Sequence, residues 1–309
     1  MNSCKRFLLV SLVTVISLVA IDFVVGKIGD YAMTKIPDHS GHFAKDNYRL
    51  NRMTDDIAIL GSSRGAHHYV SSMLSDSINR YTGKSYSLYN AAIPSKYINS
   101  NSCAAESIMG RYSPRLIIFE VSQREFNGEK ALADMEYSIA HYHTNPYVRK
   151  YLDNLGVRER IKCASNMFRY NTKLLRIASA FFTQPTEING YEPLFATMPN
   201  PENRDPIQTL MPEDADGYTV DNFVCVLETA RIKKIPLVVV SSPRYYPSDN
   251  NDYLEELCTQ HQIPYIDMFN LDFFNEHPEY FKDWGHLNDE GAHLYTAQFF
   301  EKLKPFLPE

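Results

Sequence analysis

A serine in a tight turn is the first chemically suggestive feature of the sequence. Residues 57–60 form a short apolar run, the turn Gly-Ser-Ser-Arg-Gly at 61–65 follows, and apolar residues take helical spacing from about residue 68. We expect Ser63 at the carboxyl edge of a sheet and at the positive end of a helix, where an anionic intermediate would be stabilised. Small residues also fill many such turns for structural reasons, so the turn alone does not establish a nucleophile.

An aspartate and a histidine near the C-terminus can complete this chemistry. Asp283 and His286 stand three residues apart, directly before a predicted final helix. A carboxylate at that spacing can orient an imidazole through one ring nitrogen while the other nitrogen faces a nucleophile. A solvated loop histidine beside an aspartate is the structural alternative. The serine turn and this pair together, at opposite ends of one domain, favour a Ser-His-Asp triad.

Strands and helices are predicted to alternate around these residues. Apolar runs predict strands at 57–60, 85–90, 116–121, 237–240 and 265–267, and helical spacing predicts helices at 68–79, 100–109, 220–233, 251–261 and 289–303. This order indicates an α/β fold with a doubly wound, mostly parallel sheet, whose ligand site lies beyond the carboxyl ends of the strands. Residues at about 127–217 interrupt the pattern. We interpret them as a helical and loop insertion over one end of the sheet.

The N-terminus predicts the compartment. Lys5 and Arg6 precede an apolar run, Phe7 to Ile21, that extends past one aspartate to Gly26. Its length and the lack of a good cleavage site favour an uncleaved signal anchor at 1–26 over a cleaved signal peptide. The basic flank places the rest of the chain outside the cytoplasm, periplasmic or extracellular, on a single-pass anchor. We expect a stalk at 27–54 and the folded domain at 55–309.

Composition and the remaining motifs exclude some functions. The net charge of -6 and the lack of a long basic run argue against nucleic acid as a partner. The histidines at 141 and 143 lack a third ligand at metal-binding spacing, and neither a metal nor a cofactor is expected. An aromatic cluster in the insertion is interpreted either as packing or as a sugar-stacking surface; its members are Tyr137, His141, Tyr142, His143 and Tyr147. We interpret His67 and His68 as packing or surface residues, and topology places Arg244 near the cleft.

The turn at Ser63 joined to the late D-x-x-H-L-N-x-x-G motif resembles the SGNH/GDSL hydrolase superfamily. Its membrane-tethered members include D-alanyl transfer and alginate O-acetylation proteins. The resemblance covers residue 55 to the C-terminus without the insertion, and it implies a flavodoxin-like SGNH hydrolase fold. It also implies Ser63 as nucleophile, preferred over Ser62, with Asp283 and His286 completing the triad.

The sequence departs from the family at the oxyanion hole. Where the family has N-x-G, this chain has Asn90-Ala91-Ala92, and where the family has G-x-N-D, the third strand is followed by Gln123 and Arg124. Asn90, Ala92, Gln123 and Arg124 are therefore the candidate oxyanion or substrate-binding residues.

The resemblance implies an esterase or acyltransferase that acts on an acylated carbohydrate or another ester, in the cell envelope or on secreted polysaccharide. A membrane-bound O-acyltransferase is a further expected partner. The alternative is a catalytically silent module that binds glycan or acts as a scaffold for such an acyltransferase.

Overall fold

A parallel sheet forms the centre of the fold. The computed structural model describes residues 3–128, 131–184, 187–199, 209–245, 250–269 and 271–308. Within these ranges five parallel strands lie in the order β2-β1-β3-β4-β5. Their bounds are β1 (Ile57–Leu60), β2 (Leu88–Asn90), β3 (Leu116–Glu120), β4 (Leu237–Ser241) and β5 (Tyr265–Asp267); a separate antiparallel pair comprises β6 (Phe281–Asp283) and β7 (His286–Leu287). The α/β class and the mostly parallel sheet are thus confirmed.

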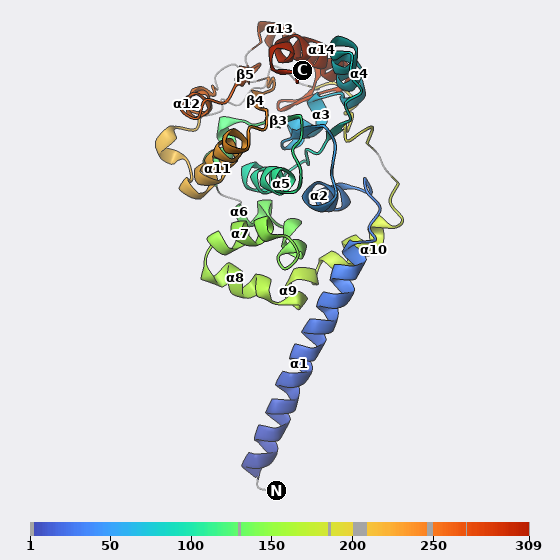
Figure 1. The fold of residues 1–309 in the computed structure, drawn as a ribbon, viewed down its shortest axis with the longest axis vertical. Coiled ribbons are helices and arrows are strands. Elements are labelled where there is room, and N and C mark those ends of the chain that lie inside the picture. The colour runs from blue at the N-terminus through green and yellow to red at the C-terminus, as the bar shows by residue number, and fades with distance from the viewer. Residues whose placement is uncertain are drawn as a thin grey trace.

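Helices cover both faces of the sheet (Figure 1). Their bounds are α1 (Ser3–Met33), α2 (His42–Asn51), α3 (Ser63–His68), α4 (Ser71–Thr82), α5 (Ile98–Arg111), α6 (Ala131–Asp134), α7 (Pro146–Asn154), α8 (Val157–Ala164), α9 (Asn166–Tyr170), α10 (Lys173–Ala180), α11 (Gly217–Lys233), α12 (Asp252–Gln260), α13 (Asp272–Glu276) and α14 (Asp289–Leu303).

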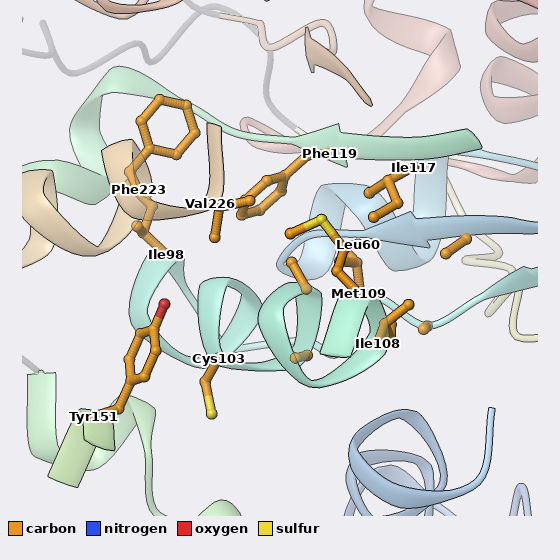
Figure 2. Packing of buried hydrophobic residues seen from close by; sticks show 14 of the residues in the cluster. Leu60, Ile98, Cys103, Ile108, Met109, Ile117, Phe119, Tyr151, Phe223 and Val226 are labelled. Atoms are coloured by element: carbon orange, nitrogen blue, oxygen red, sulfur yellow. The ribbon is translucent and has the colours of Figure 1, made fainter. Parts of the chain in front are cut away.

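Two apolar cores result from the alternation of side chains along the strands. Leu60, Ile117 and Phe119 point to one face and pack against α5 and α11, as Figure 2 shows. Ile59 and Ile118 belong to the opposite core, which is closed by α4 and α14. Because every residue of β1, β3 and β4 is buried, these strands carry continuous apolar runs.

The register of the strands fixes the edge that carries the candidate site. Ile59 pairs with Asn90 and Leu60 pairs with Phe119, so β1, β2 and β3 end close together. The chain leaves β1 for β2 on one side and returns to β3 on the other. The turn that carries Ser63 therefore lies where the winding of the sheet reverses, which is the usual ligand position in such folds.

The segment at 27–54 is not the predicted stalk. Helix α1 continues to Met33, and α2 is largely buried, packing against α5. Arg49 is fully buried in α2 and donates hydrogen bonds to Asp46, Ser100 and Asn101. The sequence predicts that these polar residues are exposed, because their buried hydrogen-bond partners are distant in the chain and cannot be identified from the polar pattern. The folded domain therefore includes residues before 55.

The insertion also differs from the prediction. Helix α7 packs on α5, and α10 packs on α2, so most of the insertion adds a layer beneath these helices and not over the strand ends. Helices α8 and α9 form the end of the domain from which α1 emerges (Figure 1). Helix α1 itself is long and apolar enough to cross a membrane.

Candidate active site

Ser63 is the first residue of α3, directly beyond β1. Two glycines allow the close approach of this turn to its neighbours. A Cβ atom on Gly61 would lie 2.9 Å from the Cβ of Glu120 on β3, and one on Gly65 would lie 2.7 Å from the Cβ of Ala92. The helix predicted at 68–79 corresponds to α4, and the short helix α3 that precedes it was not predicted. The break after His68 lets α3 hold the serine turn against the sheet.

Ser63, His286 and Asp283 form one chain of hydrogen bonds. The Nε2 atom of His286 lies 2.6 Å from the Oγ atom of Ser63, and its Nδ1 atom lies 2.8 Å from Oδ1 of Asp283. The same carboxylate oxygen accepts a hydrogen bond of 2.9 Å from the backbone N–H of Gly285. Burial is the largest single influence and would raise the pKa of Asp283, but the hydrogen bond with His286, the charge of His286 and the backbone N–H groups of Gly285 and His286 together outweigh it, so the net shift lowers the pKa. The carboxylate is therefore ionised and placed to orient the imidazole.

The preference for Ser63 over Ser62 has a geometric counterpart. Ser62 precedes α3, and its side chain is buried. Within the described part of the chain, the Oγ atom of Ser62 has no hydrogen-bond partner. The imidazole of His286 contacts Ser63 instead.

His68 supports the loop that carries His286. Its Nε2 atom accepts a hydrogen bond of 3.0 Å from the backbone N–H of Leu287, and its side chain is fully buried. Desolvation lowers the pKa of His68 well below the usual value, so the ring stays neutral and can accept this bond. The sequence prediction missed this role. The available signal was the position of His68 one helical turn beyond the nucleophile turn.

A cavity of about 210 Å³ opens in front of Ser63 and His286. Its wall is mainly polar and charged; the lining residues are Ser62, Ser63, Arg64, Tyr97, Asn99, Ser122, Arg124, Glu125, Asn127, Gly128, Asp134, Arg244, Gly285 and His286. Arg244 thus lies at the cleft, as topology indicated. The start of the insertion contributes Asn127, Gly128 and Asp134, whereas the helices α7–α10 contribute no lining residue.

Buried charges stabilise one wall of the cavity. Arg64 forms ion pairs with Glu120 at 2.9 Å and with Glu125 at 3.2 Å, and both its own side chain and that of Glu120 are buried. Burial and the nearby charge of Glu120 raise the pKa of Glu125 to about 8. Burial also raises the pKa of Asp134 to about 6, although the backbone N–H groups of Ser100 and Tyr97 favour its ionised form. The wall can therefore change charge near neutral pH.

Asn90 and Ala92, two of the four predicted oxyanion-hole residues, stabilise the turn that carries Ser63 and do not face the cavity. The side chain of Asn90 donates hydrogen bonds to the carbonyl oxygens of Gly65 and Tyr69 and accepts one from the backbone N–H of Ala92. Neither Asn90 nor Ala92 lines the cavity. The N–H of Ala92, which the sequence suggested as a donor to the oxyanion, is already used by Asn90.

The side chain of Arg124 faces the cavity, whereas that of Gln123 points away from it. Gln123 donates to the carbonyl of Leu210 and accepts from the backbone N–H of Tyr253 at the start of α12, and it does not line the cavity. Arg124 does line it, and its Nη1 atom is buried with no hydrogen-bond partner among the described residues. Of the four candidates, Arg124 is thus the side chain placed to bind a ligand near Ser63.

The aromatic cluster of the insertion is buried only in part, because His143 is exposed and Tyr137 and Tyr147 are half-buried. His141 and Tyr142 are buried among the helices of the insertion, and burial lowers the pKa of His141 to about 4. Packing therefore explains their presence. Within the described ranges, no three metal-ligating side chains gather at one point.

Comparison with models of protein families gives no match, and comparison with curated proteins gives no significant match. The resemblance to SGNH/GDSL hydrolases consequently rests on the motifs and on the site geometry.

Proposed function

We propose that the protein is a serine O-acyl esterase or O-acyltransferase. The observation that carries the proposal is the hydrogen-bonded chain from Ser63 through His286 to Asp283 at the mouth of a cavity. A hydroxyl, an imidazole and a carboxylate in this order are the parts of a nucleophilic triad.

The mechanism proceeds in two halves. His286 takes the proton of Ser63 as the Oγ atom attacks the carbonyl carbon of an ester, and Asp283 stabilises the imidazolium that forms. The tetrahedral intermediate collapses, the bond to the leaving alcohol breaks, and His286 returns the proton to that alcohol. Water or a sugar hydroxyl then attacks the carbonyl carbon of the acyl-enzyme with His286 again as base; the bond between this carbon and the Oγ atom of Ser63 breaks, and His286 returns the proton to Oγ. Water as acceptor gives hydrolysis, and a sugar hydroxyl gives transfer.

The sheet order and position of the site support an SGNH-like, flavodoxin-like fold. The order β2-β1-β3-β4-β5 matches the flavodoxin-like order of doubly wound sheets. The serine follows the first strand, and the aspartate and histidine precede the last helix. Both agree with the layout that the resemblance implies.

The cavity favours a short acyl group on a polar substrate. A volume of about 210 Å³ with a mainly polar and charged lining accommodates an acetyl-sized group, and the described lining residues form no apolar channel for a long acyl chain. Together with the anchor, this supports an acylated carbohydrate of the cell envelope or a secreted polysaccharide as substrate. The proposed partner is a membrane-bound O-acyltransferase that donates acyl groups to the same polymer.

Helix α1 is proposed as an uncleaved, single-pass anchor. It is long and apolar, with Lys5 and Arg6 at its beginning. The positive-inside rule then places the catalytic domain outside the cytoplasm.

A fluorophosphonate probe tests the nucleophile. Ser63→Ala should abolish covalent labelling of the full-length protein, whereas Ser62→Ala should retain it. Labelling that persists in Ser63→Ala would assign the nucleophile elsewhere. Hydrolysis of p-nitrophenyl acetate and p-nitrophenyl palmitate then tests the acyl length, and we expect turnover of the acetate ester only.

The alternative is a catalytically silent, SGNH-like module that binds glycan or acts as a scaffold for an acyltransferase. It is favoured by the engagement of Asn90, Ala92 and Gln123 in internal hydrogen bonds, which removes three expected donors from the cavity. Acetyl ester hydrolysis that is lost on His286→Ala would exclude this alternative.

A further inference from the structure

An apolar surface lies at the end of the domain from which α1 emerges. We define the apolar face by the exposed side chains of Val157 and Ile161 on α8, Leu174 and Leu175 on α10, and Phe181 and Phe182 directly after α10. Three of them are among the most exposed large apolar side chains of the domain: Ile161 is 69% exposed, Leu175 79% and Phe182 85%. Large apolar patches of this kind mark interaction surfaces.

Helical geometry shows that this exposure is systematic. On α8, Cys163 is buried, whereas Val157 and Ile161 are one turn apart on the outer side. On α10, Lys173, Ile177 and Ala180 face inward, and Leu174, Leu175 and Ala178 face outward. Both helices thus carry apolar residues on the side that a water-facing helix would make polar.

The apolar face is held at a fixed place along α1. The carboxylate of Asp22 accepts hydrogen bonds from the hydroxyl of Ser165, the backbone N–H of Asn166 and the backbone N–H of Met167. Ser165 lies between α8 and α9, and Asn166 and Met167 are the first residues of α9. The start of α9 is therefore fixed at the level of residue 22.

Further contacts make the upper part of α1 a component of the fold. Arg169 is fully buried and pairs with Asp30 of α1 at 2.6 Å. A Cβ atom on Gly26 would lie 2.5 Å from the side chain of Asn166, and one on Gly29 would lie 2.4 Å from that of Tyr170, so the helices touch closely. Loss of α1 would leave the charge of Arg169 buried without its partner carboxylate, which is strongly unfavourable. This joint favours an uncleaved α1.

The length of α1 below this joint matches a bilayer. Residues 3–21 rise about 28 Å at 1.5 Å per residue, close to the roughly 30 Å of the hydrocarbon core. If this part spans the membrane, Asp22 lies at the lipid–water boundary, and so does the turn between α8 and α9. The exposed apolar side chains of α8, which ends at this turn, then meet the bilayer and not bulk water, and those of α10 lie further along α1, beyond the contact of Tyr170 with Gly29.

The local charge fits the same partner. Residues 157–183 contain six basic residues and one acidic residue, and four of the basic residues lie at the surface, namely Arg158, Arg160, Lys162 and Arg176; the whole chain has a net charge of -6. Arg158 and Arg160 are exposed on α8 beside the apolar side chains. Basic residues next to apolar ones are typical of helices that lie in an anionic lipid interface.

We propose that the apolar face lies in the interfacial layer of the membrane that holds α1, with Arg158 and Arg160 near anionic lipid headgroups. This proposal rests on the anchoring role of α1 given above and is independent of the acyl chemistry at Ser63. It makes the protein attach through two elements, one that spans the bilayer and one that lies on its surface.

Site-specific fluorescence quenching in proteoliposomes tests the proposal. The full-length protein with Cys4→Ser and Cys225→Ser receives one new cysteine, at Ile161, Leu175 or Phe182, and an environment-sensitive NBD label. Val13→Cys in α1 reports whether the anchor is inserted. Ile232→Cys, at an exposed position of α11 (72% exposed), is the matched control outside the apolar face. The vesicles contain phosphatidylcholine and phosphatidylglycerol, and fluorophosphonate labelling of Ser63 is measured on the same samples.

We expect nitroxide-labelled lipid to quench most of the emission at Val13, Ile161, Leu175 and Phe182 and little at Ile232, with aqueous iodide giving the reverse order. Quenching at Val13 but iodide access at the three sites of the apolar face would overturn the proposal and leave the anchor in place. Protection from both quenchers there would indicate a protein partner and would also overturn it. Absence of quenching at Val13 would refute the anchor and this inference together, whereas Ser63 labelling reports separately on the catalytic proposal.

Discussion

Replacement of Asp283 by Asn isolates the charge of the proposed triad from its geometry. Oδ1 of Asp283 accepts from both His286 and the N–H of Gly285. In Asp283→Asn the N–H of Gly285 still requires an acceptor, so the amide should turn its oxygen toward it. The same oxygen then still accepts from Nδ1 of His286, which keeps the catalytic tautomer. We therefore expect this variant to lose the negative charge and to retain the orientation.

The size of the effect follows from the exposure of the carboxylate. Two unit charges about 4 Å apart interact with about 4 kcal/mol at an effective dielectric constant of 20 and with about 1 kcal/mol in water. The side chain of Asp283 is 51% exposed, so an intermediate value of about 2–3 kcal/mol is appropriate. At about 1.4 kcal/mol for each tenfold change in rate, kcat/KM should fall roughly 100-fold.

The assay is the second-order rate of fluorophosphonate labelling, together with kcat/KM for p-nitrophenyl acetate. Glu290→Gln, which removes an exposed carboxylate at the start of α14, controls for the general loss of negative charge near the site. A loss of about 10⁴-fold in Asp283→Asn would refute the retained tautomer, because that is the order of magnitude for a triad with a misoriented imidazole. A loss no larger than that of Glu290→Gln would refute a role for this carboxylate in charge stabilisation.

Three further predictions concern groups around the site and the stability of the domain. Arg124→Gln should lower kcat about 100-fold with little change in KM if Arg124 donates to the oxyanion, and a raised KM at constant kcat would contradict that role. His68→Phe leaves the N–H of Leu287 without its acceptor and should lower the free energy of unfolding by about 1–3 kcal/mol, as thermal unfolding of the detergent-solubilised protein would show, whereas His68→Gln should retain most of the stability. His141 has a folded-state pKa of about 4, below the value near 6.5 expected when unfolded, so the unfolded state binds the proton first and stability falls as the pH drops from 6.5 toward 4. His141→Gln should make that fall smaller by about 3 kcal/mol, and an unchanged pH dependence would refute the assignment.

The strands were predictable because burial on both faces leaves continuous apolar runs. Residues 57–60 and 116–120 needed no partner information to be identified as strands. The buried polar residues of α2 were not predictable, since Arg49 is stabilised by Ser100 and Asn101, which are distant in sequence. A polar pattern indicates exposure unless its partners are known, and for this reason the segment was interpreted as a stalk.

In the proposed site, too, some residues could be predicted from the sequence and others could not. Ser63, Asp283 and His286 carry local signals, a strand-to-helix turn and a three-residue spacing, and the structure brings them within hydrogen-bond distance. The oxyanion-hole candidates depended on an ungapped match to a family pattern. Such a match gives the position of Gln123 but not the direction of its side chain, which is set by contacts with Leu210 and Tyr253.

If α1 is the anchor proposed above, its close joint with the domain determines how far the cleft can reach from the membrane. A flexible tether would let Ser63 reach a wide range of heights above the membrane. Contacts of Asp22, Asp30 and two glycines instead fix α1 to the domain, so the domain can only diffuse laterally and rotate about the axis of α1. The cleft then stays at one constant height above the membrane surface. With the proposed activity, an ester would be processed only where its polymer passes at that height, so the stiffness of one helical joint would set the depth of the envelope in which the chemistry takes place.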